Sequence, residues 1–327
     1  MKSLRIFIYA IGMLLVIGNA LASVHTQFIA MGESGVILKS LDDGNNWEAV
    51  YNPNPRNSIY GMTFNESKYF GVGDNGSLII STDGINWNYS ENGLGTDQKI
   101  LGIVTGSKGE MVAVGEKGLI LSSNDGVKWK FHVSHTLYNL RSVSSGMSGV
   151  SFIAVGDNGT ILTSEDGEQW SIKNVSNNVL NSVNYNGRVF VIVGDNGTIL
   201  TSIDGSNWTK QPSPTSEDLL GVVYGSGAAG EFLAVGSNGT IISTHDFKFA
   251  ESWVKNPFSN TSSLNSVTYG NGEFVVVGEN GLIANSQDGF NWNIVDSETK
   301  IRFTNVVAGF LNNIPVYNSC QIICVVK

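Results

Sequence analysis

Aspartate residues recur in this sequence at a nearly constant distance ahead of tryptophan, and they are the first residues that could do chemistry. Each lies in a short turn that contains Ser and Gly. Paired carboxylates act as acid and base in glycoside hydrolysis, and clustered carboxylates bind Ca²⁺. The six pairs are Asp42 and Trp47, Asp83 and Trp87, Asp125 and Trp129, Asp166 and Trp170, Asp204 and Trp208, and Asp288 and Trp292.

A structural role explains these aspartates better than catalysis does. An Asp side chain accepts hydrogen bonds from backbone N–H groups of its own turn, the Gly supplies a positive φ, and the Trp packs over the hairpin. The copies are spread along the chain and do not converge on one point. We therefore expect no catalytic residue, no metal site and no cofactor.

A second set of acidic residues follows the Val-Gly or similar pair that ends an apolar run. This position is acidic in six of seven copies, and Ser237 occupies the seventh. Asp is favoured here by the turn that follows it, but a ring of carboxylates could also attract a cation or a basic peptide. Both interpretations stay open. The candidates for partner binding from this set are Asp74, Glu116, Asp157 and Asp195, and the remaining acidic members are Glu33 and Glu279.

Comparison of the copies with one another identifies a variable position beside this acidic one. The pattern is an apolar residue, a variable residue, Ser or Gly, and an apolar residue. The variable column reads Tyr60, Leu101, Arg141, Asn181, Leu220, Asn265 and Thr304, and the column two residues earlier includes Lys99 and Arg302. We predict partner binding by Tyr60, Lys99, Arg141 and Arg302. The alternative is that they fill the interface between neighbouring repeats.

Seven repeats must position these side chains. The seven Trp residues of the chain recur every 38 to 45 residues. In the copy from Leu180 to Gln211, strands are predicted at 180–185, 189–193 and 198–202, with a fourth that begins at Trp208. Its Asn196-Gly197 pair favours a type I′ hairpin turn. Four antiparallel strands every 40-odd residues describe a propeller blade. The fold class is therefore all-β, a seven-bladed β-propeller without helices after the first segment.

The two ends of the repeat region complement each other. The first copy begins near Gln27 with its second strand, whereas 302–309 has the pattern of a first strand with no complete copy behind it. We predict that this C-terminal strand completes blade one and closes the ring. Closure of this kind removes exposed sheet edges.

The N-terminal segment has the pattern of a signal peptide. Lys2 and Arg5 precede an apolar stretch from Ile6 to Ile17, and 20–22 read Ala-Leu-Ala. The stretch is too short to span a bilayer. We predict a signal peptide at 1–22, a propeller at 23–309, a tail at 310–327 of uncertain structure, and a periplasmic or secreted monomer without a membrane span after cleavage. Pairing of Cys320 with Cys324 stays open.

Composition excludes two broad classes. The 327-residue chain is 41% hydrophobic and only 14% charged. This excludes a disordered protein, because disordered chains are poor in apolar residues and rich in charge. Its formal net charge of −9 argues against a nucleic-acid partner, because nucleic-acid binding needs clustered Lys and Arg. Nothing in this balance indicates a cofactor.

The turns from Ser81 to Trp87 and from Ser164 to Trp170 resemble the Asp-box, or BNR, repeat of sialidase-like propellers. With the VG-x-N-G-x-I-L hairpin and seven copies, the chain is most similar to the photosystem II stability/assembly factor family. That resemblance implies a non-catalytic assembly factor that holds a client membrane protein. The sequence departs from the family by its single Gly and frequent Asn before Trp, and by having few arginines: after position 22 they are Arg56, Arg141, Arg188 and Arg302.

Two classes of function follow from this resemblance. The first is an exported, non-catalytic propeller that binds a protein client or scaffolds assembly of an envelope complex. The second is a sialidase-like glycoside hydrolase or a lectin, with a carbohydrate partner. Sialidases hold the substrate carboxylate with three arginines, so three of the four arginines would have to converge.

Overall fold

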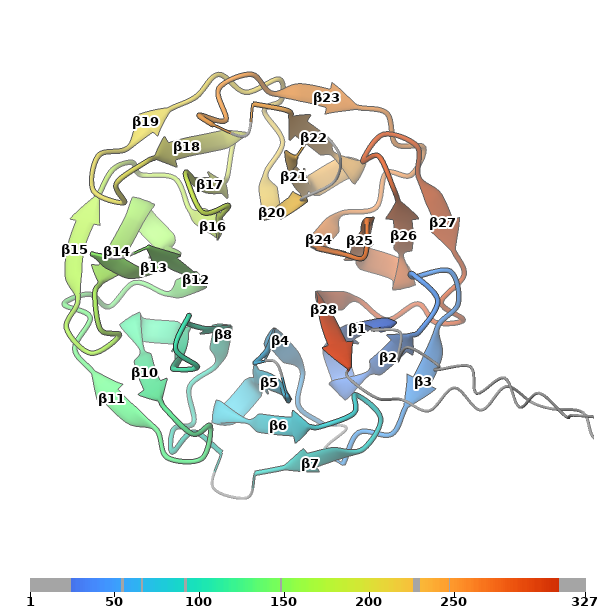
Figure 1. Cartoon of the computed structure of the whole chain (residues 1–327), viewed down its shortest axis with the longest axis horizontal. Helices are drawn as coiled ribbons and strands as arrows, with labels where there is room; N and C mark the ends of the chain where they lie inside the picture. Colours follow the sequence, from blue (N-terminus) through green and yellow to red (C-terminus); the bar gives the residue numbers. More distant parts are fainter. Residues whose placement is uncertain are drawn as a thin grey trace, which may run out of the picture.

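The computed structural model describes residues 25–311, with gaps at 54–55, 66, 91–92, 148, 226–229 and 247. The predicted signal peptide, both cysteines and residues 312–327 lie outside the described residues. Seven four-stranded antiparallel sheets are arranged as blades around a central axis (Figure 1). No α-helix occurs in the described ranges, and none of their helical turns is long and apolar enough to cross a membrane. The predicted seven-bladed propeller is confirmed.

Each blade runs from an innermost first strand to an outermost fourth strand (Figure 1). Blade one contains β28 (Phe303–Leu311), β1 (His25–Gly32), β2 (Ile37–Ser40) and β3 (Glu48–Val50). Blade two contains β4 (Ile59–Phe64), β5 (Tyr69–Gly73), β6 (Leu78–Ser81) and β7 (Trp87–Tyr89). Blade three contains β8 (Ile100–Thr105), β9 (Met111–Gly115), β10 (Ile120–Ser123) and β11 (Lys130–His132). Blade four contains β12 (Leu140–Met147), β13 (Val150–Gly156), β14 (Thr160–Ser164) and β15 (Ser171–Asn174). Blade five contains β16 (Leu180–Tyr185), β17 (Phe190–Gly194), β18 (Thr198–Ser202) and β19 (Thr209–Lys210). Blade six contains β20 (Leu219–Gly225), β21 (Glu231–Gly236), β22 (Ile241–Thr244) and β23 (Val254–Asn256). Blade seven contains β24 (Leu264–Gly270), β25 (Glu273–Gly278), β26 (Ile283–Ser286) and β27 (Asn293–Val295).

The hydrophobic core lies between the blades. The second strand of each blade is buried on both faces, and for this reason it is a continuous apolar run. Ile153 and Val155 of blade four pack with Phe190 and Ile192 of blade five, and each of the other interfaces between blades is filled in the same way. The ring is therefore held together by apolar packing between sheets that share no hydrogen-bonded strand pair.

The ring closes as the sequence predicts. β28 pairs with β1 in an antiparallel register that runs from His25 opposite Leu311 to Met31 opposite Asn305. Blade one therefore takes its first strand from one end of the described chain and its other three strands from the opposite end (Figure 1). The strand extends to Leu311, two residues past the predicted boundary at 309.

The Asp-containing turns are networks of short hydrogen bonds. In blade four, Asp166 Oδ1 accepts hydrogen bonds from the N–H groups of Glu168 and Gln169, both at 2.8 Å, and Trp170 Nε1 donates to Gly167 O at 3.1 Å. The backbone bonds, first that from Gln169, hold the pKa of Asp166 below its ordinary value. In blade six, which lacks the Gly, Ala250 takes a φ of 54° and its carbonyl accepts the Trp253 Nε1 bond.

The turn of blade seven makes stability depend on acid pH. Hydrogen bonds led by that from the Asn291 N–H lower the pKa of Asp288 to about 2, against about 3.9 in an unfolded chain. The stabilisation is present above about pH 4 and is lost as the pH falls toward 2. We expect Asp288→Asn to lower the free energy of unfolding by about 1 kcal/mol at pH 7 and to reduce its loss between pH 4 and 2. Urea unfolding at a series of pH values measures both, and an unchanged acid slope would contradict this role.

Candidate functional site

A pocket occupies the central axis, and the variable column of the sequence lines it. The inner strands enclose about 250 Å³ of space, and the outer part of this channel is bordered by eight residues. We call these eight the channel mouth: Tyr60, Leu101, Arg141, Asn181, Leu220, Asn265, Arg302 and Thr304. Three of the four residues predicted to bind a partner therefore meet at one opening, and the fourth, Lys99, contacts the Tyr60 hydroxyl at its rim.

A β-bulge places each variable residue at the mouth. In blade four, Leu140 pairs with Gly156 and Ser142 pairs with Val155, so Arg141 has no partner in the register. The same shift leaves Tyr60, Leu101, Asn181, Leu220, Asn265 and Thr304 unpaired in the other blades. Bulges redirect side chains, and they are common beside binding sites. The sequence pattern identified the column but not the bulge that produces it.

The residue after each variable residue is Ser or Gly in six blades and Asn305 in blade one, and it lies where the inner strands approach one another. A Cβ on Gly61 would lie 3.0 Å from the Cα of Gly102, so the first strands of blades two and three are in close contact there. Where the residue is Ser, its hydroxyl accepts a backbone bond from the next blade, as Ser142 Oγ does from Val183 N at 3.3 Å. The fixed column therefore joins the blades, and the variable column is free to differ.

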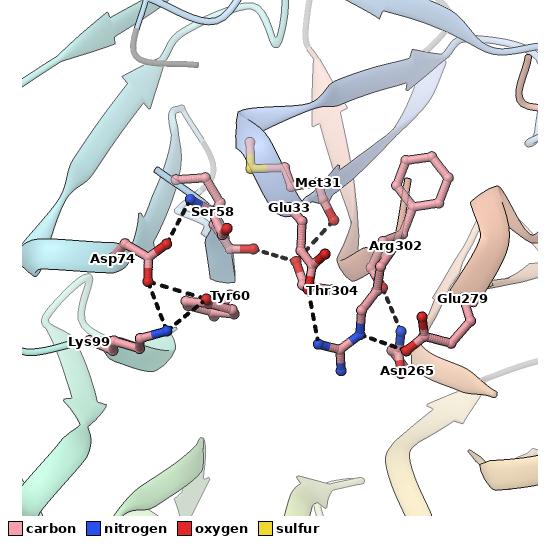
Figure 2. A network of polar contacts seen from close by, with 12 residues as sticks. Met31, Glu33, Ser58, Tyr60, Asp74, Lys99, Asn265, Glu279, Arg302 and Thr304 are labelled. Carbon is pink, nitrogen blue, oxygen red and sulfur yellow. Dashed lines mark hydrogen bonds and ion pairs between the residues drawn. The ribbon is translucent and has the colours of Figure 1, made fainter. Parts of the chain in front are cut away.

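Lys99 joins two blades at the rim of the mouth. Its Nζ lies 3.2 Å from the hydroxyl of Tyr60 and 3.1 Å from Asp74 Oδ1, and the Tyr60 hydroxyl also donates to Asp74 Oδ1 at 3.2 Å (Figure 2). Hydrogen bonds to Tyr60 and then to Asp74 raise the pKa of Lys99. Asp74 Oδ2 accepts the Ser58 N–H at 3.0 Å. The positive charge of Lys99 is therefore balanced within the protein.

Arg302 makes the corresponding bridge across the closing blade. Its Nε lies 2.7 Å from Glu279 Oε1 in blade seven, and its Nη1 lies 3.4 Å from Glu33 Oε1 in blade one (Figure 2). Beside it, Asn265 donates to the Phe303 carbonyl at 2.7 Å, and Thr304 donates to the carbonyls of Met31 and Ile59. Arg302 and its neighbours thus tie blades seven, one and two together.

Arg141 differs from the other two cations. Its Nε donates to Asp157 Oδ1 at 2.6 Å within the same blade, and its side chain is 42% exposed. Among the described residues, its Nη1 and Nη2 have no hydrogen-bond partner. Among the described residues Arg141 therefore keeps both terminal nitrogens for a ligand, whereas Arg302 uses its Nη1 for Glu33.

The predicted acidic ring lies around the same opening, but its carboxylates are already engaged. Asp74 and Asp157 pair with Lys99 and Arg141, Asp195 Oδ1 accepts from Asn181 Nδ2 at 2.9 Å, and Glu116 Oε2 accepts the Lys99 N–H at 3.3 Å. The variable column and the acidic ring, which look separate in the sequence, therefore contact each other in the structure: Tyr60 bonds to Asp74, Arg141 to Asp157 and Asn181 to Asp195. Their separation of 14 to 17 residues within one blade is the signal that could have revealed the pairing.

A second titratable pair lies at the opposite end of the blades. Glu231 at the start of β21 is 7% exposed, and its Oε2 lies 3.6 Å from His245 Nδ1. Burial raises the pKa of Glu231. Across the part of the chain that the structure describes, no group of three His, Cys, Asp or Glu residues is placed to hold a metal ion.

Burial of the Glu231 charge leads to a prediction about alkaline conditions. A carboxyl whose folded pKa is raised binds its proton more tightly when folded, so ionisation above that pKa costs stability, and the cost disappears as the pH falls. We expect Glu231→Gln to raise the free energy of unfolding at pH 8 by about 1 kcal/mol and to change it little at pH 4. Thermal unfolding at the two pH values measures the difference. A loss of stability at pH 8 would show that the His245 contact outweighs the burial.

Comparisons with known proteins identify the fold. No protein-family model matches the sequence, and no curated protein matches it. A structure of YCF48 bound to a D1 peptide is similar, with a TM-score of 0.64 and 18% identity over 84% of this chain and 90% of that one. YCF48 from Cyanidioschyzon merolae has a TM-score of 0.58 and 16% identity, over 74% of this chain and 86% of that one. Virginiamycin B lyase from Staphylococcus aureus has a TM-score of 0.61 and 14% identity, over 83% of this chain and 88% of that one.

These similarities establish the architecture and no more. By their names, one of these similar proteins binds a peptide and another is a lyase, so the fold serves both binding and catalysis. The chain is a seven-bladed β-propeller whose β-bulges gather a variable, mostly polar set of side chains around one end of its axis.

Proposed function

We propose that the chain is an exported, non-catalytic propeller that binds a protein client at the channel mouth. The observation that carries this proposal is the bulged column. Seven side chains of five residue types meet there, on a frame that is Ser or Gly in six of the seven blades. A surface that varies on a constant frame suits ligand recognition. Arg141, with unbonded Nη atoms, is the anchor that we assign to the client.

The similar YCF48 structure supports a protein client, because it holds a peptide on the same fold. We further propose that the Asp-containing turns are Asp-box repeats with a structural role, as their internal hydrogen bonds suggest. The periplasm or the extracellular space is the proposed location, and an envelope complex is the proposed setting of the client.

Catalysis is the second candidate, since virginiamycin B lyase has a similar fold. The arrangement of arginines argues against a sialidase-like site. Arg141 and Arg302 border the mouth, whereas Arg188 follows Asn186 in the turn between β16 and β17, at the end of those strands away from the Asp195 turn. Arg56 lies in the loop before β4 and does not line the pocket. We therefore favour binding.

Site-specific photo-crosslinking tests the proposal. The chain from Ser23 carries a photoreactive residue at Leu101 in the mouth, or at Lys255 on the outer strand of blade six as the control. We expect one envelope protein to crosslink to the Leu101 derivative, not to the Lys255 derivative, and to be lost when Arg141→Ala is added. Equal crosslinking from both positions, or turnover of glycoside or lyase substrates by the unmodified chain, would overturn the proposal.

Export makes a separate prediction about the N-terminus. If 1–22 is a signal peptide, the protein recovered from the envelope or medium of an exporting host begins at Ser23. Intact-mass measurement of the purified protein checks this. Recovery of a chain that still carries Lys2 and Arg5, in the cytosolic fraction, would contradict export.

A further inference from the structure

Blade three departs from the repeat at a place that lies outside the channel mouth. A groove of about 500 Å³ lies between the hairpin turn at Lys117 and the loop that joins β11 to β12. Its principal lining residues are Gln98, Lys117, His132, Val133, His135 and Leu137, and we call it the blade-three groove. The groove is at the same end of the blade as Glu116, which places it beside the channel mouth on one face of the ring.

The first departure is an exposed leucine. In all seven blades the third residue before the first strand is exposed, and in six it is polar or charged: Arg56, Asp97, Asn177, Ser216, Thr261 and Lys300. Before blade four, in the loop that follows β11 of blade three, it is Leu137, which is 85% exposed, and Val133 of the same loop is 69% exposed. Large apolar side chains grouped on a surface mark interaction sites.

The loop that carries Leu137 is fixed by hydrogen bonds. Thr136 Oγ1 accepts the Tyr138 N–H at 3.1 Å, as Thr215 accepts that of Glu217 at 3.0 Å in blade five. The Lys117 N–H donates to Asn139 Oδ1 at 3.0 Å. The loop therefore shares this hydrogen bond with the loop after blade five, and Leu137 lies between residues that are held by hydrogen bonds. Preorganisation of this kind lowers the cost of binding.

The second departure is a lysine at a position that favours asparagine. The first central residue of the hairpin turn has a φ between 53° and 56° in every blade. Five blades have Asn there and one has Ser, whereas blade three has Lys117. Asn tolerates the left-handed region better than Lys does, so turn geometry does not account for the lysine. Lys117 lines the same groove as the exposed Leu137 and Val133.

Charge distinguishes this groove from the rest of the chain. The protein has 28 Asp and Glu against 19 Lys and Arg, yet none of the residues that line the groove is acidic. The lining contains Lys117 and two histidines, of which His132 bonds to Ser122 Oγ at 2.7 Å. Exposed apolar side chains together with a cation in one groove complement a ligand in which an apolar side chain stands next to a carboxylate.

We propose that the blade-three groove binds a protein segment in which a large apolar side chain is flanked by carboxylates, with the side chain against Leu137 and Val133 and a carboxylate at Lys117. This site does not require the channel mouth to bind anything. It is a second recognition site on the same face of the ring.

Fluorescence anisotropy with short labelled peptides tests the proposal. The probes have Leu or Phe between Asp residues, and the matched peptides have Lys in place of Asp, or Ala in place of the central residue. We expect the acidic apolar peptides alone to bind, and Lys117→Asn and Leu137→Thr each to weaken binding by about tenfold. Lys255→Asn removes a distant exposed lysine, so this variant should bind as the unmodified chain does.

The variants also separate recognition from folding. Lys117→Asn and Leu137→Thr restore residue types that other blades use, so the melting temperature should be unchanged or higher while binding weakens. Equal binding of acidic and basic peptides, no binding at millimolar peptide, or unchanged binding by both variants would overturn the proposal. So would vesicles of phosphatidylglycerol and phosphatidylcholine that bind through the groove when the peptides do not, because the ligand would then be a lipid surface. Crosslinking at Leu101 tests the channel mouth and peptide binding tests the groove. Failure of one experiment therefore leaves the proposal for the other site standing.

Discussion

A chain that ends at Lys300 loses β28, and we expect it not to form the closed ring. Without β28, the buried strand β1 has no inner neighbour, and Phe28 and Ala30 lose their contacts with Phe303 and Val306 in the core between blades seven and one. The bonds of Arg302 and Thr304 to neighbouring blades are lost as well. Burial of one large apolar side chain contributes about 1.5–3 kcal/mol, so these losses together approach the whole stability of a typical protein.

The expected result is loss of the cooperative thermal transition, with aggregation during size-exclusion chromatography. A chain that ends at Leu311 is the matched control, since it keeps every residue of β28 and removes only 312–327. We expect it to unfold at nearly the temperature of the full chain. A cooperative transition at the same temperature for the chain ending at Lys300 would show that the ring does not depend on this strand.

Gly156→Ala should be among the most destabilising single substitutions in the protein. A Cβ at this position would lie 1.9 Å from the Asn139 carbonyl oxygen, which accepts the Asp157 N–H at 2.9 Å. The φ of Gly156 is −171°, so the obstacle is contact with backbone and not the conformation of the residue itself. Neither strand can move without breaking the bulge that holds Arg141. We expect a loss of about 3 kcal/mol or more in the free energy of unfolding.

Urea denaturation measures this loss, and a control distinguishes it from a general intolerance of glycine replacement. Gly187 lies in the open turn between β16 and β17, where a Cβ would have no neighbour within 4 Å, and its φ of 89° is one that Asn tolerates better than Ala. Gly187→Asn should cost less than about 1 kcal/mol. If Gly156→Ala costs no more than the control, the close approach is not what requires glycine here.

The architecture could be predicted because the strand and turn signals are local in sequence and recur in all seven repeats. The predicted strands at 180–185 and 198–202 coincide with β16 and β18, since the Asn196-Gly197 turn fixes one end of β18. The second strand begins at Phe190 and ends at Gly194, one residue later than predicted at both ends. The fourth strand, β19, is limited to Thr209 and Lys210, because the outermost strand has a partner on one side only.

The chemistry of the mouth could be predicted only in part. The variable column is visible because repeats can be compared, but some contacts of the mouth cross between blades. Lys99 reaches Tyr60, 39 residues away, and Arg302 reaches Glu33, 269 residues away. No local sequence pattern predicts how one blade is rotated relative to the next, and this rotation is what brings such residues together. The sequence therefore identifies Lys99, Arg141 and Arg302 as equivalent candidates. The structure distinguishes them, because Lys99 and Arg302 join neighbouring blades whereas Arg141 bonds within its own blade.

Because β28 closes the ring, blade one can be completed only at the end of synthesis. β1 emerges from the ribosome among the first residues of the propeller, and its partner β28 emerges among the last, so blade one is incomplete until the whole repeat region has been made. Contacts at such long sequence separation form slowly, because the intervening chain must first be brought together. Until then β1 offers an unpaired apolar edge, which is a hazard for aggregation. Between the synthesis of these two strands, the open edge of β1 can therefore pair with strands of other chains.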